Sequence, residues 1–174
     1  DSRQIGRNEL ATMQAALAYY DAQIEYAALD RDGDGILEYA QKFISMVGRQ
    51  DGLYWETKPG EPQSPLGPLF ANDAPEDDYH GYKFRILTSQ GPSAHGGAYD
   101  YLIGGRLTGG FARVAWPVEY GETGVMSFMI NQAGTVYESD LGPDGAATAT
   151  AMQRFDPGPD WVLSQDAQAG ANSD

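Results

Sequence analysis

The fold is decided by residues 8–29, NELATMQAALAYYDAQIEYAAL. The larger apolar residues of this stretch recur every three or four positions, which places them on one side of an α-helix of about twenty residues. The predicted apolar stripe consists of Leu10, Met13, Leu17, Tyr20, Ile24 and Ala27 or Ala28. We favour a helix whose stripe packs on a core over a zipper that pairs with a partner helix.

Acidic residues alternate directly after this helix, in the stretch DRDGDGILE at residues 30–38. Three carboxylates at alternate positions, followed by glycine, match the first half of the oxygen-lined loop that binds calcium in helix-loop-helix proteins. Gly35 permits the positive-φ turn that brings the next carbonyl onto the ion. The predicted Ca2+ ligands are Asp30, Asp32, Asp34, the carbonyl of Ile36, Glu38 at the ninth position and Gln41 at the twelfth.

The twelfth position of such a loop is normally a bidentate glutamate, so a glutamine there means that the last ligand is missing or replaced. An acidic, solvated turn between two helices is the alternative interpretation. The second helix is predicted over residues 37–47, with Tyr39, Phe43 and Met46 or Val47 inward and Gly48 at its C-terminal end. The calcium loop, residues 30–41, would then connect two helices. A regulatory calcium sensor is not expected, because such loops come in pairs.

Residues 51–78 contain five prolines, several glycines and little periodicity. We expect a long ordered loop that covers an edge or a face of the sheet, and we regard it as a second candidate surface for recognition. Its candidate anchors are Leu53, Tyr54, Trp55, Leu66, Leu69 and Phe70.

Residues 79–140 contain short runs rich in aromatic and β-branched residues, separated by glycine turns. These runs predict an antiparallel meander with strands at residues 82–88, 98–103, 110–116, 124–131 and 135–140. The run at 124–131 is apolar enough to be buried on both faces. A short helix follows at 143–154, then a short strand or anchor at 161–163, and residues 164–174 form a polar tail. The sequence thus predicts one α+β domain over residues 1–163, with the long helix across one face of the sheet.

Charge and composition exclude several classes of function. The chain has 11 Lys and Arg against 25 Asp and Glu, a net charge of −14, which repels nucleic acid and anionic lipid and favours cations or basic partners. With no cysteine, it forms no disulfide and no thiolate metal site. No run of eighteen apolar residues exists, so we expect no membrane span. The chain begins at Asp1, and we expect an upstream signal or domain to have preceded it.

Catalytic motifs are absent from the sequence. His80 and His95 are not spaced as metal ligands, and no Gly-x-Ser-x-Gly or phosphate-binding glycine motif occurs. We therefore expect no enzymatic activity. The alternative is a periplasmic ligand-binding protein or a hydrolase with a cleft formed by the His80 region and residues 51–78, in which Asp77 or Asp78 would orient His80.

The order of elements, a long helix before a glycine-punctuated antiparallel sheet, resembles the globular part of type IV pilins and pseudopilins. The run GETGVMSFMINQAGTVY at residues 121–137 is similar to the closing strands of bacterial pilin-like proteins. The apolar half-helix that fills a pilus core is absent from this sequence, so assembly into a filament would need another mechanism.

A second resemblance covers most of residues 5–161. The chain resembles an exported bacterial family known as domain of unknown function 2950, in the stretches at residues 5–10, 30–41, 51–55, 64–69, 80–87, 97–101, 114–117 and 140–144. The resemblance implies export to the periplasm or beyond. It also implies that this chain corresponds to the C-terminal part of a protein with a signal sequence and an additional domain. It implies no catalytic or binding residues.

The sequence as a whole favours an exported, calcium-stabilised structural or interaction protein. We expect calcium to neutralise Asp30, Asp32 and Asp34 and to fix the angle between the two helices. Self-association into homo-oligomers or filaments, through the helix, the loop or a sheet edge, is the expected mode of assembly.

Overall fold

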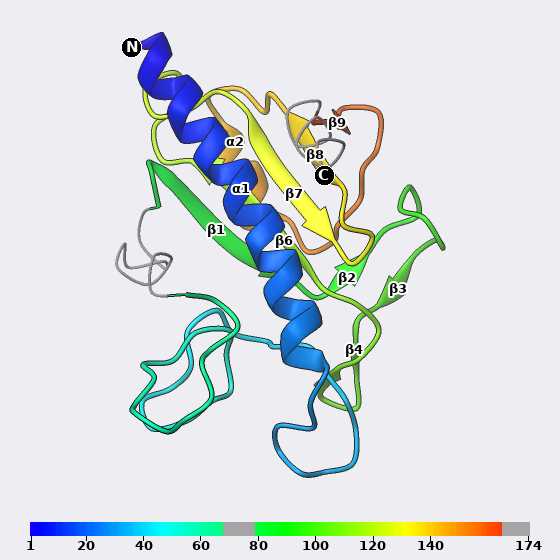
Figure 1. The fold of residues 1–174 in the computed structure, drawn as a ribbon. Coiled ribbons are helices and arrows are strands. Elements are labelled where there is room, and N and C mark those ends of the chain that lie inside the picture. Colours follow the sequence, from blue (N-terminus) through cyan, green and yellow to red (C-terminus); the bar gives the residue numbers. More distant parts are fainter. Residues whose placement is uncertain (68–78, 165–174) are drawn as a thin grey trace, which may run out of the picture.

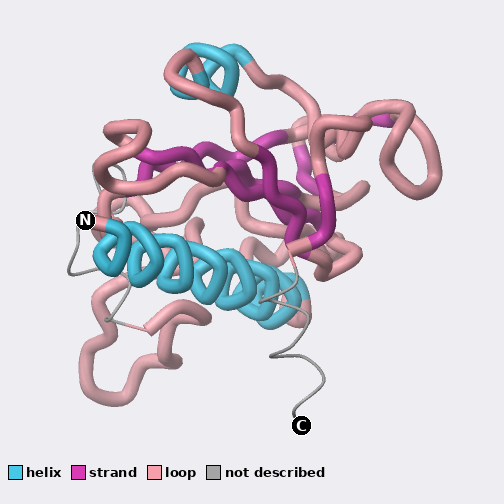
Figure 2. Tube along the Cα trace, turned by 90° about the horizontal axis from the view of Figure 1, so that it is seen from above, coloured by secondary structure: helices cyan, strands magenta, loops and turns pink. Residues whose placement is uncertain are grey.

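The fold is α+β, as predicted, and consists of one long helix laid across an antiparallel sheet (Figure 1). The computed structural model describes residues 1–67 and 79–164. Helix α1 spans Ser2–Ala27 and the short helix α2 spans Gly145–Ala151. The two helices lie on opposite faces of the sheet, which is therefore the middle layer of the molecule (Figure 2).

The main sheet is a meander in the order β1-β6-β7-β8-β9, and each neighbouring pair is antiparallel. Its strands are β1 (Tyr82–Leu87), β6 (Ala112–Pro117), β7 (Ser127–Asn131), β8 (Val136–Ser139) and β9 (Val162–Leu163). Each lies within a few residues of a run predicted from the sequence. Strands β6 and β7 are buried along their whole length, which confirms the prediction of a strand covered on both faces at residues 124–131.

Two short hairpins separate β1 from β6. They are formed by β2 (Ser89–Gln90) with β3 (Tyr99–Asp100), and by β4 (Leu102–Ile103) with β5 (Arg106–Leu107). The single strand predicted at residues 98–103 is therefore divided in two. The division falls at Tyr101, which is fully buried and whose N–H donates to the carbonyl of Thr88 at 2.8 Å. Gly104 and Gly105 form the turn of the second hairpin, with φ of 59° and 80°.

Helix α1 begins six residues earlier than the periodicity indicated. The carboxylate of Asp1 caps the helix by accepting the N–H of Gln4 at 2.8 Å. A side-chain oxygen at this position satisfies an N–H group that has no partner within the helix. The predicted start at residue 8 was wrong because the first two turns are polar and carry no apolar stripe.

The face of α1 that packs on the sheet also differs from the predicted stripe. Of the large residues in that stripe only Met13 is buried, while Leu17 and Tyr20 pack partly against the core. Leu10 and Ile24 are 47% and 46% exposed. The buried residues are Asn8, Thr12, Met13, Ala15, Ala16, Tyr19, Ala22, Gln23 and Tyr26. Alanines let the helix lie close to the sheet, and the buried polar side chains donate to backbone carbonyls of the helix and of neighbouring loops, so hydrophobicity alone predicted this face only in part.

The second helix predicted at residues 37–47 does not form. The backbone there pairs instead with the start of the long loop: the Tyr54 N–H donates to the Phe43 carbonyl and the Ser45 N–H to the Tyr54 carbonyl, both at 2.9 Å. A Cβ at Gly52 would lie 2.7 Å from the Ile44 carbonyl carbon, so glycine allows this close approach. Backbone groups used in this way are not free for helical bonds.

Without that helix, two of its predicted inward residues point outward. Met46 is 54% exposed and Val47 is fully exposed, whereas Tyr39 and Phe43 do pack partly against the core. The calcium loop therefore does not connect two helices. It connects α1 to an extended segment.

The long loop packs on the molecule through its own side chains, as expected. Leu53, Trp55 and Leu66 are at most 5% exposed. Tyr54 packs partly against the core, and the remaining two candidate anchors, Leu69 and Phe70, lie outside the described residues. The loop's described part thus adds to the core beside the sheet.

The C-terminal region extends the sheet and covers its second face. Helix α2 is shorter than the predicted 143–154, and Arg85 of β1 donates to the carbonyls of Ala149 and Met152 at its end. A cation at a helix C-terminus is favourable. Ser164 is fully buried, and the remainder of the predicted polar tail, residues 165–174, lies outside the described residues. Within the described ranges, no helix is long and apolar enough to cross a membrane.

Candidate functional site

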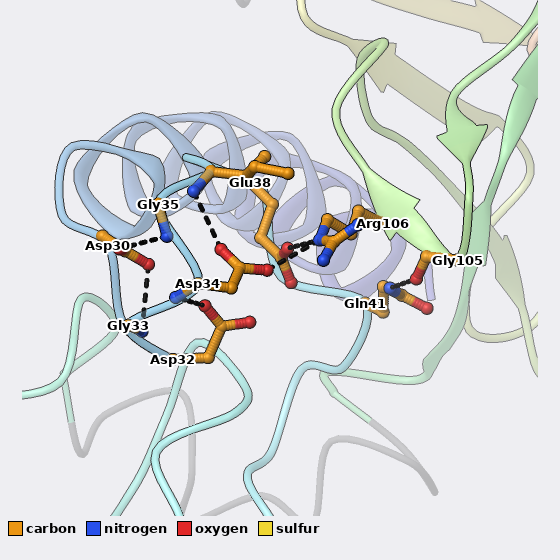
Figure 3. A network of polar contacts seen from close by, with 10 residues as sticks. Asp30, Asp32, Gly33, Asp34, Gly35, Glu38, Gln41, Gly105 and Arg106 are labelled. Carbon is orange, nitrogen blue, oxygen red and sulfur yellow. Dashed lines mark hydrogen bonds and ion pairs between the residues drawn. The ribbon is translucent and has the colours of Figure 1, made fainter.

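The acid loop, residues 30–36, follows α1 and is shaped by its own side chains (Figure 3). Its aspartates accept backbone N–H groups within the loop: Asp30 accepts from Gly33 (3.0 Å) and Gly35 (2.8 Å), Asp32 from Asp34 (3.2 Å), and Asp34 from Ile36 (2.8 Å). Gly33 and Gly35 have φ of 74° and 86°, a region that other residues rarely adopt. The local sequence thus builds the turn that the calcium prediction required.

The three aspartates are brought together at a spacing that fits a calcium ion. Asp30, Asp32 and Asp34 each offer an oxygen, and these oxygens lie within 4.8 Å of one another. Two oxygens bound to one Ca2+ at about 2.3–2.6 Å are separated by at most about 4.6–5.2 Å. All three residues are exposed, so an ion reaches them from solvent.

Glu38 adds a carboxylate oxygen with unsatisfied bonding capacity. Its Oε2 is buried and accepts no hydrogen bond from the described part of the chain. Its ion-pair partner is the Arg106 Nε, at 3.8 Å, beyond hydrogen-bond distance. A buried acceptor without a donor is destabilising, and a bound cation would satisfy it. The three exposed aspartates therefore fit a hard cation, and Glu38 lies outside their 4.8 Å cluster as a further carboxylate that could turn to it.

The hairpin of β4 and β5 packs against the acid loop. Arg106 of β5 places its Nε 2.6 Å from Asp34 Oδ2. The side-chain amide of Gln41 donates to the carbonyl of Gly105 at 2.9 Å, so Gln41 lies beside the hairpin turn rather than among the three aspartates (Figure 3). A residue distant in sequence thus supplies the cation nearest to the candidate ligands.

The pKa values of the acidic groups reflect this arrangement. The hydrogen bond from Arg106 lowers the pKa of Asp34. Burial, followed by repulsion from Asp32 and Asp34, raises the pKa of Glu38. For Asp32, the backbone hydrogen bond from Asp34 lowers the pKa, but burial and the neighbouring carboxylates outweigh it, so its pKa is raised. Crowded carboxylates with one guanidinium between them still repel one another, and a divalent cation would relieve this repulsion.

Two contacts hold residues 39 and 40, which follow the acid loop, against the rest of the molecule. Gln23 of α1 is fully buried, and its side-chain amide donates to the carbonyl of Ala40 and accepts from the Ala40 N–H, both at 2.8 Å. The N–H of Tyr39 donates to the carbonyl of Leu107 at 2.8 Å. The chain that leaves the acid loop is thus held against both the helix and the β4–β5 hairpin.

The structure therefore supports part of the predicted ligand set. Asp30, Asp32 and Asp34 come together, Glu38 stands next to them, and Ile36 follows in the loop with its N–H on Asp34. The amide nitrogen of Gln41 bonds to the hairpin, and its role as a ligand through Oε1 stays a prediction. Sequence reasoning missed Arg106 and Gln23, since their partners lie 72 and 17 residues away in the chain.

The histidines do not form a site in the described part of the chain. His80 is exposed, has a φ of 50° and packs edge-on against Tyr79, with ring centroids 4.5 Å apart. Its proposed carboxylate partners, Asp77 and Asp78, lie outside the described residues. His95 is exposed in a turn.

A family model described as "Protein of unknown function (DUF2950)" matches residues 1–163. The match begins at the first residue, and it lends no support to the expectation that the chain is only the C-terminal part of such a protein. No curated protein and no solved structure matches the chain. The likeness to pilins therefore stays a prediction.

Proposed function

The chain belongs to the DUF2950 family, whose description states no activity, and we propose from the site itself that it is an exported structural or interaction protein stabilised by calcium. The observation that carries this proposal is the clustering of three aspartate oxygens within 4.8 Å on a turn shaped by two positive-φ glycines. Glu38, with its unpartnered buried oxygen, supports the same conclusion.

Calcium would act here as a clamp. It would neutralise the aspartates and tie the end of α1 to the segment that carries Glu38, and through Gln41 and Arg106 to the β4–β5 hairpin. The sequence predicted that calcium fixes the angle between two helices. This link replaces that prediction, since the second helix does not form.

Export is supported by the character of the loop. It lacks the bidentate glutamate of tight sites, and loops of low affinity, about 10⁻⁴–10⁻³ M, suit extracellular modules, where calcium is abundant. The resemblance to an exported family favours the same location.

The calcium proposal is tested with Asp32→Ala, which removes one ligand without touching the Arg106 contact, and with Asp21→Ala as the charge-matched control on the exposed side of α1. Alanine is used because asparagine at this loop position can itself bind Ca2+ through its amide oxygen. Unfolding is followed in calcium and in excess chelator, and Ca2+ binding is measured by calorimetry. Calcium at 100 times its Kd stabilises the folded state by about 2.7 kcal/mol. We expect this gain in the wild type and in Asp21→Ala, and its loss in Asp32→Ala. An equal gain in all three proteins would place the ion elsewhere.

Self-association is the second element of the proposal. Leu10 and Ile24 are exposed on α1, and the edge strand β9 exposes Val162 and Leu163 at 59% and 44%. Open edge strands and exposed apolar residues are common sites of association. Light scattering coupled to size separation, in calcium and in chelator, tests it: a dimer or larger species supports self-association, whereas a monomer in both buffers contradicts it.

A further inference from the structure

A cavity of about 430 Å³ adjoins the acid loop. Its volume lies within the range of about 300–1,000 Å³ that is typical of small-molecule sites. Asp32 and Glu38 belong both to the candidate calcium site and to the lining of this cavity. An ion held by the three aspartates would therefore border the cavity at Asp32.

The protein does not supply a full set of calcium ligands. Calcium takes six to eight oxygens, and the bidentate carboxylate of the twelfth loop position is absent here because that residue is Gln41, whose amide nitrogen donates to the Gly105 carbonyl. Positions left open on the ion are filled by water or by oxygens of a bound molecule. Since Asp32 and Glu38 line the cavity, a molecule in the cavity is well placed to supply them.

The cationic residues of the cavity differ in whether they are already paired. Arg31 donates to the carbonyl of Tyr26 and stacks on the Tyr26 ring, and Lys42 forms an ion pair with Asp51 at 2.8 Å. The Arg49 side chain, in contrast, makes no hydrogen bond or ion pair with any residue in 1–67 or 79–164. It is the guanidinium of the cavity that is available to an anion.

The remaining lining is suited to a sugar ring. Tyr39 contributes aromatic surface and is held by a contact with Phe111, whose ring centroid is 4.8 Å away. Tyr26 is only 6% exposed, and Arg31 lies over its ring. The Gln50 amide adds a donor and an acceptor for hydroxyl groups. A ring bearing both hydroxyls and a carboxylate matches an ion, a free guanidinium and a tyrosine side chain better than an apolar molecule does.

We propose that this cavity binds an acidic sugar, a uronate, whose carboxylate pairs with Arg49 and whose hydroxyl oxygens complete the coordination of calcium held by Asp30, Asp32 and Asp34. The inference rests on the proposed calcium site. Calcium brings the sugar to a protein whose net charge of −14 would otherwise repel an anion.

The test uses calorimetry in two stages. Ca2+ is titrated first into the protein alone, and sodium glucuronate or sodium galacturonate is then titrated into the calcium-saturated protein. We expect heat in both stages, and no uronate binding in chelator. Absence of heat in the first stage contradicts the proposed calcium site. Heat in the first stage without binding in the second contradicts only the sugar proposal.

Matched variants and ligands sharpen the second stage. Arg49→Gln should weaken uronate binding roughly tenfold or more, because a charge-assisted hydrogen bond is lost, and should leave Ca2+ binding unchanged. Arg3→Gln, an exposed change on α1, should alter neither. Glucose and galactose, which lack the carboxylate, should bind far more weakly. Equal binding of the neutral sugars, or uronate binding that survives in chelator, would overturn the proposal.

Discussion

Two arginines seven positions apart, Arg106 on β5 and Arg113 on β6, lie in opposite environments. Arg106 has 39% of its side chain exposed and contacts the carboxylates of Asp34 and Glu38. Arg113 is 6% exposed and has no carboxylate partner within the described residues. Its guanidinium lies over the rings of Phe84, Phe43 and Tyr19, at 4.1, 4.3 and 5.4 Å from their centroids.

The comparison shows two ways of accommodating a positive charge. Near the acid loop, the charge of Arg106 is balanced by carboxylates, and its pKa is raised, chiefly by the hydrogen bond to Asp34. Under the helix, aromatic faces attract the guanidinium of Arg113, but burial lowers its pKa to about 10. At the acid loop, a metal ion can take the place of the Arg106 guanidinium beside the carboxylates. Arg113, in contrast, is a fixed part of the core.

The largest effect is expected from Arg113. Arg113→Ala should lower the free energy of unfolding by about 2–4 kcal/mol, because it leaves a cavity between three aromatic rings. Arg113→Met keeps most of the volume and removes a buried, uncompensated charge, so it should stay within about 1 kcal/mol of the wild type. Urea unfolding of both variants measures the two changes in the free energy of unfolding. A loss in the methionine variant as large as in the alanine variant would mean that the charge itself stabilises the core.

A smaller, opposite effect is expected from Arg106. Its guanidinium places a positive charge next to the candidate ligands Asp34 and Glu38, where it opposes a divalent cation. Arg106→Gln should tighten calcium binding roughly fivefold to tenfold, as the removal of one charge at contact distance in a high-dielectric site implies. Calorimetry with Ca2+ measures it, and Arg7→Gln on α1 is the control. Weaker binding in Arg106→Gln would show that the arginine organises the loop rather than competes with the ion.

The smallest effect concerns pH. Because Arg106 lowers the pKa of folded Asp34, their contact stabilises the protein above the unfolded pKa of about 3.9, and this stabilisation is lost as pH falls through the lower folded value. In chelator, the melting temperature of the wild type should exceed that of Arg106→Gln at pH 6, and the gap should close as pH falls through the lowered pKa of Asp34. High salt should narrow it at pH 6. A gap unchanged with pH would exclude the Asp34 contact as its source.

Local patterns in the sequence predicted those structural elements that residues adjacent in the chain determine. The acid loop was found because its carboxylates and glycines are adjacent in the chain, and β6 and β7 because their runs are apolar and bounded by turns. The helix at 37–47 was wrong because its backbone pairs with residues 52–54, which no local pattern reveals.

Contacts across the chain were not predictable in this way. The buried face of α1 depends on how closely alanines and tyrosines fit the sheet, not on where leucines recur. Arg106 reaches Asp34 only because the β4–β5 hairpin folds back on the loop, and the amide nitrogen of Gln41 bonds to that hairpin for the same reason. The position of a candidate ligand in the loop pattern therefore did not predict its contacts across the chain.

The double hydrogen bond between Gln23 and Ala40 makes the acid loop behave as part of a cyclic peptide. The ring closed by that contact contains the whole loop, so the two ends of the loop are already held together when an ion arrives. Less conformational entropy is then lost on binding, and a ligand set without its final glutamate gains affinity from preorganisation. A buried glutamine of α1 thus contributes to ion binding from a distance, without contacting the ion.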